Sequence, residues 1–227
     1  MKTLVIIFLI HVFLLGCSIN SEIKGAKLYQ ENFSGFSFSA TSDISQPLLS
    51  DYEYQAVGGE LLIVTSCEQA DGIDISTIAD YDYFRFKMLL VSCAAIDKYS
   101  TATAAHNNNF PSKLDEAFIY QLPAAIVPLL SKAEGIQREG ESVKSYDANT
   151  QITTEKENIF KLLTTEDEVY LTLLARGDFT NDGFEELLIQ SEWYARTAHG
   201  KHVDLLILSR PDGSGPVEIS WRLNKLD

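Results

Sequence analysis

The C-terminal part of the chain is a series of short apolar runs separated by turn residues, and this pattern constrains the fold more than any other feature. The runs cover residues 159–163, 169–176, 187–193, 203–209 and 217–223. Segments rich in glycine, asparagine and aspartate, such as 180–183 and 211–215, lie between them. Short runs joined by close turns predict an antiparallel β-meander.

The preceding residues follow a helical period instead. Apolar side chains recur every three or four residues over 78–99, which predicts a long helix. Residues 114–130 predict a second helix that is kinked or divided at Pro123. Residues 60–66 fit either a buried strand or a short helix, because the run is too short to decide.

Helices followed by strands predict an α+β fold. We expect a helical N-terminal half, about 33–135, packed with a C-terminal antiparallel β-meander, about 143–227. Together they would form a single globular domain, 33–227.

The N-terminus has the composition of an export signal. Lys2 precedes an apolar run over 4–15, which as a helix spans about 18 Å and is too short for a hydrocarbon core of about 30 Å. We therefore interpret residues 1–16 as a signal peptide. The polar residues of 17–32 are expected to form a flexible tether.

The end of this signal, Leu14-Leu15-Gly16-Cys17, resembles the lipobox of bacterial lipoproteins. The resemblance implies that Cys17 becomes the first mature residue and carries a diacylglycerol thioether and an acyl chain such as palmitate. Residue 18 is Ser rather than Asp, which by the same resemblance implies a place in the cell envelope at the outer membrane. The alternative is an ordinary signal peptide with a chance cysteine.

The charge balance limits the partners. The chain has 32 acidic and 18 basic residues, a formal charge of −14. Such a surface repels phosphate backbones and anionic lipid, so we expect no nucleic-acid partner and membrane contact only through the anchor.

The chain has three cysteines. With Cys17 acylated, Cys67 and Cys93 remain, and export to an oxidising compartment predicts a disulfide between them. The alternative is two buried free thiols, because both residues lie in apolar segments.

An acidic turn at 177–187 resembles the FG-GAP/VCBS calcium loop. The resemblance implies a structural Ca²⁺ site, and oxygen ligands at alternate loop positions suit this cation. The expected ligands are Asp178, Thr180, Asp182, the Phe184 carbonyl and Glu186. The alternative is a plain Asn-Asp-Gly turn between two strands.

A second cluster lies near a predicted hairpin tip and comprises Trp193, Tyr194, Arg196, His199 and His202. Exposed aromatic rings beside an arginine suit recognition of a carboxylate or a sugar. We favour the alternative, in which Trp193 belongs to the core and the other residues form a solvated turn.

The sequence has no nucleophile-elbow, phosphate-loop or His-Glu-x-x-His motif, and the body resembles no characterised enzyme family. We therefore assign no catalytic residue. The preferred hypothesis is a membrane-anchored lipoprotein that acts as a non-enzymatic binding or structural module, with an envelope protein or glycan as partner. The alternative is an envelope hydrolase whose site is assembled from dispersed residues.

The anchor has a direct test. Cys17→Ser should remain as unprocessed precursor without incorporated palmitate, because the substitution removes the only thiol in the lipobox. Metabolic labelling with palmitate, followed by gel electrophoresis, measures this. If the variant still carries label, the lipobox interpretation is wrong.

Overall fold

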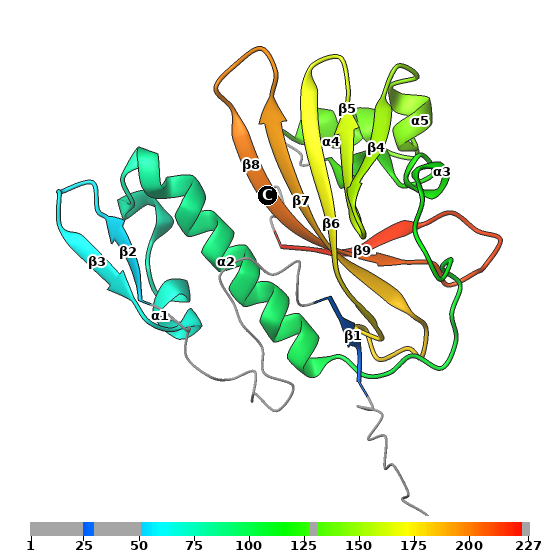
Figure 1. The fold of residues 1–227 in the computed structure, drawn as a ribbon, viewed down its shortest axis with the longest axis horizontal. Helices are drawn as coiled ribbons and strands as arrows, with labels where there is room; N and C mark the ends of the chain where they lie inside the picture. Colours follow the sequence, from blue (N-terminus) through cyan, green and yellow to red (C-terminus); the bar gives the residue numbers. More distant parts are fainter. Residues whose placement is uncertain (1–24, 30–50, 128–130, 224–227) are drawn as a thin grey trace, which may run out of the picture.

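The computed structural model describes residues 25–29, 51–127 and 131–223 (Figure 1). The predicted signal peptide, Cys17 and the lipobox therefore lie outside the described residues, as does most of the predicted tether. Within these described ranges, no helix has the length and apolar character needed to cross a membrane.

The centre of the molecule is an antiparallel sheet in which consecutive strands are neighbours. Its strands are β4 (Gln151–Lys156), β5 (Ile159–Leu163), β6 (Asp167–Gly177), β7 (Glu186–Ala195), β8 (Lys201–Ser209) and β9 (Glu218–Arg222). Tight turns make this order possible, and Asn158, between β4 and β5, has the positive φ of 63° that asparagine tolerates. The runs predicted from turn spacing correspond to β5 through β9.

A short strand, β1 (Lys27–Leu28), pairs antiparallel with β6. It lies within the range interpreted as a tether. A Cβ atom at Gly177 would approach the Cβ of Ala26 to 2.3 Å, so glycine at the end of β6 permits this close approach.

Strands β6, β7 and β8 are buried on both faces of the sheet. Leu187 and Ile189 belong to one core cluster, whereas Leu188 belongs to the other, as the two-residue alternation of a strand requires. Cross-strand partners agree, because Ile189 faces Leu206 and Leu188 faces Ile207. Each face must therefore be covered by other elements.

One long helix, α2 (Asp80–Thr101), covers one face beside β8 (Figure 1). Its Val91 and Ala95 are fully buried against strand residues such as Leu205. The other side of α2 packs on a two-stranded sheet, β2 (Tyr52–Gln55) and β3 (Leu61–Val64). The ring of Tyr54 meets the ring of Phe86 edge-on at 5.0 Å.

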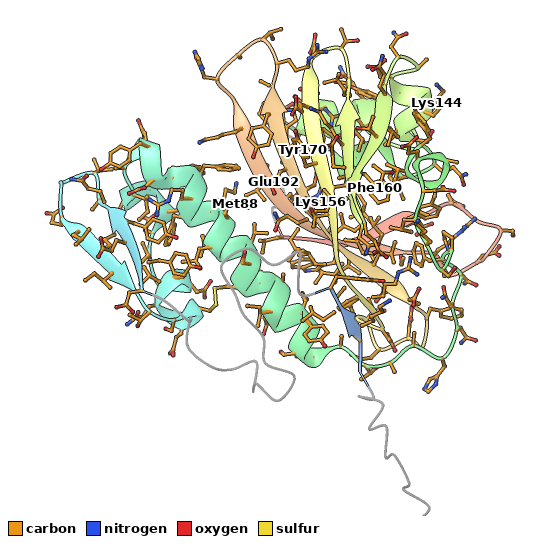
Figure 2. The ribbon with its side chains drawn as sticks, in the orientation of Figure 1. Met88, Lys144, Lys156, Phe160, Tyr170 and Glu192 are labelled. Carbon is orange, nitrogen blue, oxygen red and sulfur yellow. A yellow bond between two sulfur atoms is a disulfide. The ribbon has the colours of Figure 1, made fainter. Side chains whose placement is uncertain are left out.

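The connection from β3 to α2 contains α1 (Cys67–Asp71) and η2 (Ile75–Thr77). Ser66 caps α1 by accepting from the Gln69 amide. A Cys67–Cys93 disulfide, with Cα atoms 5.5 Å apart, joins α1 to α2, and Figure 2 shows its sulfur–sulfur bond in yellow. The structure thus contains the cysteine pairing expected from the sequence.

Short helical segments cover part of the opposite face. They are α3 (Glu116–Ile119), η3 (Ala124–Ile126), α4 (Lys132–Arg138) and α5 (Val143–Tyr146). Side chains cap them in turn: Asp115 caps α3, Ser131 caps α4, and Ser142 forms a capping box with Ser145 on α5. Apolar residues of α3, η3 and α5 join the core cluster of Phe160 and Leu171.

The predicted α+β class, with a helical N-terminal half packed against a meander, is wrong. Of the described residues, 37% lie in strands or bridges and 27% in helices, so the fold is mostly β. Over 114–127, the described part of the helix expected over 114–130, the chain instead forms α3, η3 and irregular structure, because Pro123 ends helical hydrogen bonding there. Residues 60–66, which fit either a strand or a short helix, contain the strand β3 at 61–64.

Candidate functional site

A cavity of about 500 Å³ lies between the short helices and the β5–β6 turn. Its apolar wall comes from residues including Val143, Leu162 and Trp193. Its polar wall comes from Glu134, Arg138, Tyr146, Asp147, Thr164, Thr165, Glu166 and Asp167, among others. We call this space the α4–α5 cavity. Its volume suits a small organic ligand.

Arg138 is the most unusual residue in the wall, because its charge is only 7% exposed. Its Nη1 donates to the Val127 carbonyl at 3.1 Å, and its guanidinium lies 5.2 Å from the centre of the Tyr146 ring. The Glu134 carboxylate is 3.7 Å from Nη2. Among the described residues, Nε has no hydrogen-bond partner. A buried cation with an unmet donor is costly unless another group satisfies it.

Trp193 also lines the cavity, and a hydrogen bond and burial hold its side chain in place. Its Nε1 donates to Asp167 Oδ1 at 2.7 Å, and the side chain is 8% exposed. A Cβ atom at position 200 would lie 2.7 Å from the indole ring, so Gly200 leaves room for Trp193. The indole is therefore a fixed surface rather than a mobile one.

Two hydrogen-bonded connections fix the rim. Asp147, directly after α5, accepts from the Thr165 amide at 3.3 Å. Arg196, beyond the end of β7, donates from Nη1 to the Thr164 carbonyl at 2.7 Å. The β5–β6 turn is thus attached both to α5 and to the β7–β8 connection, which makes the cavity a preformed space.

The described wall contains carboxylates, threonine hydroxyls, one guanidinium and aromatic rings, but no serine, cysteine, histidine or lysine. Carboxylates, threonine hydroxyls and a tyrosine phenol are groups that bind ligands and that also serve in catalysis.

The structure separates the predicted Trp193–His202 cluster into several places. Trp193 lines the cavity, and Arg196 supports its rim. Tyr194 lies on the opposite face, with its ring 6.0 Å from Phe84 of α2. His199 is exposed in the turn. Neighbouring strand residues point to opposite faces, so this cluster does not form one site.

His202 lies near α2. Its Nδ1 is 3.2 Å from Lys87 Nζ, and since an ammonium group only donates, Nδ1 accepts. Burial, together with Lys87 and Arg222, lowers the pKa of His202 to about 4. The imidazole is therefore neutral at pH 7.

On the face of the sheet away from the α4–α5 cavity, Tyr170 and Glu192 are cross-strand partners, and both are labelled in Figure 2. Tyr170 donates to Glu168, and Tyr194 donates to Glu192 at 2.8 Å. Lys161 pairs with Glu168 at 3.0 Å. These contacts pair the polar side chains of this surface with one another. The surface is therefore a weaker candidate for ligand binding than the cavity wall that contains Arg138.

The predicted calcium loop connects β6 to β7. Asp178 is 4% exposed, and its two oxygens accept from the Asp182 and Gly183 amides at 3.1 and 2.9 Å. Glu186 is 1% exposed, and its Oε2 accepts from the Phe179 and Thr180 amides, both at 2.9 Å.

The turn itself depends on positive φ values of 61° at Asn181 and 86° at Gly183. Burial raises the pKa of Glu186 despite its amide donors. The Phe184 amide donates to Asp182 at 2.8 Å.

This arrangement satisfies the carboxylates with backbone amides. Within the described part of the chain, no three histidine, cysteine, aspartate or glutamate side chains are placed to hold a metal ion. Each Asp178 oxygen accepts only one amide hydrogen bond and keeps a second lone pair, so these donors do not exclude an ion. Calcium at this loop stays a prediction from the resemblance.

Comparison with known proteins gave no match: no family model, curated protein or solved structure is significantly similar to this chain. The site therefore has to be interpreted from its own geometry. Sequence reasoning missed Arg138, Asp147 and Asp167. No local motif marks them, because they meet only after the chain folds back on the sheet.

Calcium binding predicts a shift in thermal stability. A bound ion should raise the unfolding midpoint in millimolar calcium relative to chelator, by about 2–4 °C for each kcal/mol of binding energy. Asp178→Asn should abolish the shift. Asp212→Asn is the matched control, because Asp212 also accepts from a turn amide, that of Ser214 at 3.0 Å. Equal midpoints with calcium and chelator would mean that amides alone hold the turn.

The lowered pKa of His202 predicts acid sensitivity. The unfolded imidazole takes up a proton near pH 6.5, but the folded one only near pH 4, so stability is complete above pH 6.5 and falls between these values. His202→Gln should remove this component. Urea unfolding at pH 7 and pH 5 should show the wild type losing about 1 kcal/mol more than the variant, since partial exposure reduces the full effect. Parallel losses would contradict the assignment.

Proposed function

We propose that this protein is a lipid-anchored, non-enzymatic binding module of the cell envelope, with the α4–α5 cavity as its binding site. The resemblance of residues 14–17 to a lipobox supports the location. The observation that carries the binding role is the rigid cavity beside Arg138, a buried cation with an unpartnered Nε among the described residues.

The composition of the cavity supports a binding role. Apolar side chains such as Leu162 and Trp193 can cover the body of a ligand, while Arg138 and the carboxylates orient its polar groups. Because Asp167 and Arg196 already fix the surrounding backbone and indole, little ordering has to accompany binding.

Trp193 provides a fluorescence test. The chain has two tryptophans, and Trp221 lies in the core cluster on the α2 side, so Trp221→Phe leaves Trp193 as the only indole reporter. The probe is a set of small aromatic and aliphatic fragments with equal numbers of cationic, neutral and anionic members. We expect at least one member to shift the Trp193 emission saturably at millimolar concentration or below.

Thr165→Trp, added to Trp221→Phe, is the control variant. Thr165 is exposed at the rim, so a larger side chain should obstruct the cavity without disturbing the core. Since the new indole also fluoresces, binding to this variant is measured by ligand-observed NMR. Failure of every fragment to bind, or equal binding to the obstructed variant, would contradict the proposed function.

A further inference from the structure

We propose that the α4–α5 cavity selects a small organic ligand with an ammonium group next to a neutral carbonyl, the chemistry of an amino-acid amide. This inference rests on the proposed function, because it names the ligand class of the same cavity. Three features carry it: the charge of the wall, the partners of each carboxylate, and the position of Arg138.

The wall has an excess of negative charge. Glu134, Asp147, Glu166 and Asp167 line the cavity together with one guanidinium, that of Arg138. Arg196 adds a second cation at the rim, which still leaves the acids in the majority. In a chain with a formal charge of −14, this wall attracts a cation and repels an anion.

The carboxylates differ in how far they are already engaged. Asp167 accepts from Trp193, and Asp147 accepts from the Asn149 and Thr165 amides. Glu134 lies beside Arg138.

Glu166 is exposed at the rim, and no contact of its carboxylate is found among the described residues. Glu166 is therefore the main partner for a ligand ammonium group, and the other acids contribute to the field.

Arg138 determines the second polar group. Its Nη1 donates to a backbone carbonyl with one of two N–H groups, so the Nη groups of the guanidinium keep further donors for a ligand, whereas Nε is enclosed by protein atoms. A carboxylate on the ligand would satisfy Arg138 but would be repelled by the surrounding acids. A neutral carbonyl accepts a hydrogen bond without that repulsion, which makes it the favoured acceptor.

The apolar wall admits a hydrophobic side chain on the same ligand. Val143, Leu162 and Trp193 are all buried and all line the cavity. A phenyl group attached to the ammonium and carbonyl unit would cover this surface and gain hydrophobic free energy. L-phenylalaninamide combines these three features in one small probe.

The test compares four molecules with the same phenyl body by isothermal titration calorimetry. L-phenylalaninamide has both polar groups, 3-phenylpropanamide lacks the ammonium, phenethylammonium lacks the carbonyl, and 3-phenylpropanoate is an anion. We expect L-phenylalaninamide to bind about tenfold more tightly than either singly modified probe, with the anion weakest. Glu166→Gln should weaken L-phenylalaninamide about threefold to fivefold and leave 3-phenylpropanamide unchanged.

Glu218→Gln is the matched control, because Glu218 is an exposed acid of β9 that does not line the cavity. If 3-phenylpropanamide or the anion binds as tightly as L-phenylalaninamide, or if none of the four binds, the ligand class is wrong, while fragment binding still tests the cavity. If Thr165→Trp binds all four as well as the wild type does, the ligands lie elsewhere and the proposed function fails as well.

Discussion

The burial of both faces of the central strands is the constraint on which the rest of the structure depends. Side chains of β7 alternate between two core clusters, so Leu187 and Leu188 both need cover, but from opposite sides. An antiparallel sheet with one solvated face would not impose this. The elements outside the sheet therefore pack on both of its faces.

The two faces of the sheet are covered by different kinds of element, and the candidate site lies on the face that is covered less continuously. Helix α2 is one uninterrupted element, attached by the disulfide to α1 and packed against β8. The opposite face is covered by short segments that follow one another closely, and among them lies the α4–α5 cavity. Capping residues such as Asp115 and Ser142 stabilise helices too short to be stable alone.

The β6–β7 connection shows how buried charge is accommodated elsewhere. Asp178 and Glu186 are nearly inaccessible, but backbone amides of their own loop donate to them. The same segment pairs with the chain leaving α2, since the Thr103 amide donates to the Asp178 carbonyl at 3.0 Å. Arg138 has an Nε without a hydrogen-bond partner among the described residues, as Arg176 and Arg222 also have, and of these three it is the one that lines the α4–α5 cavity, which supports our proposal of a ligand site there.

Much of the strand pattern was predictable from the sequence, because turn residues act locally. The segments 180–183 and 211–215 mark strand ends whatever covers the sheet. The α+β class was wrong because periodicity over 114–130 indicates burial but does not distinguish a helix from short segments laid on a sheet.

No local sequence pattern marks the cavity. Trp193 was singled out with Tyr194, but the alternation of a strand puts them on opposite faces. Asp167, which accepts from its indole, and Arg138, which lines the same cavity, lie 26 and 55 positions earlier in the chain and are brought together with it only by tertiary packing.

The central claim is that the incompletely covered face is the ligand site. The two indole N–H signals in a ¹⁵N NMR spectrum test it most directly, because Trp193 lines the cavity whereas Trp221 lies on the α2 side. On addition of L-phenylalaninamide, we expect the Trp193 indole signal and the amides of α4, α5 and 164–167 to shift together. Shifts confined to Trp221, α2 or β3, with the Trp193 signal unchanged at saturation, would contradict the account.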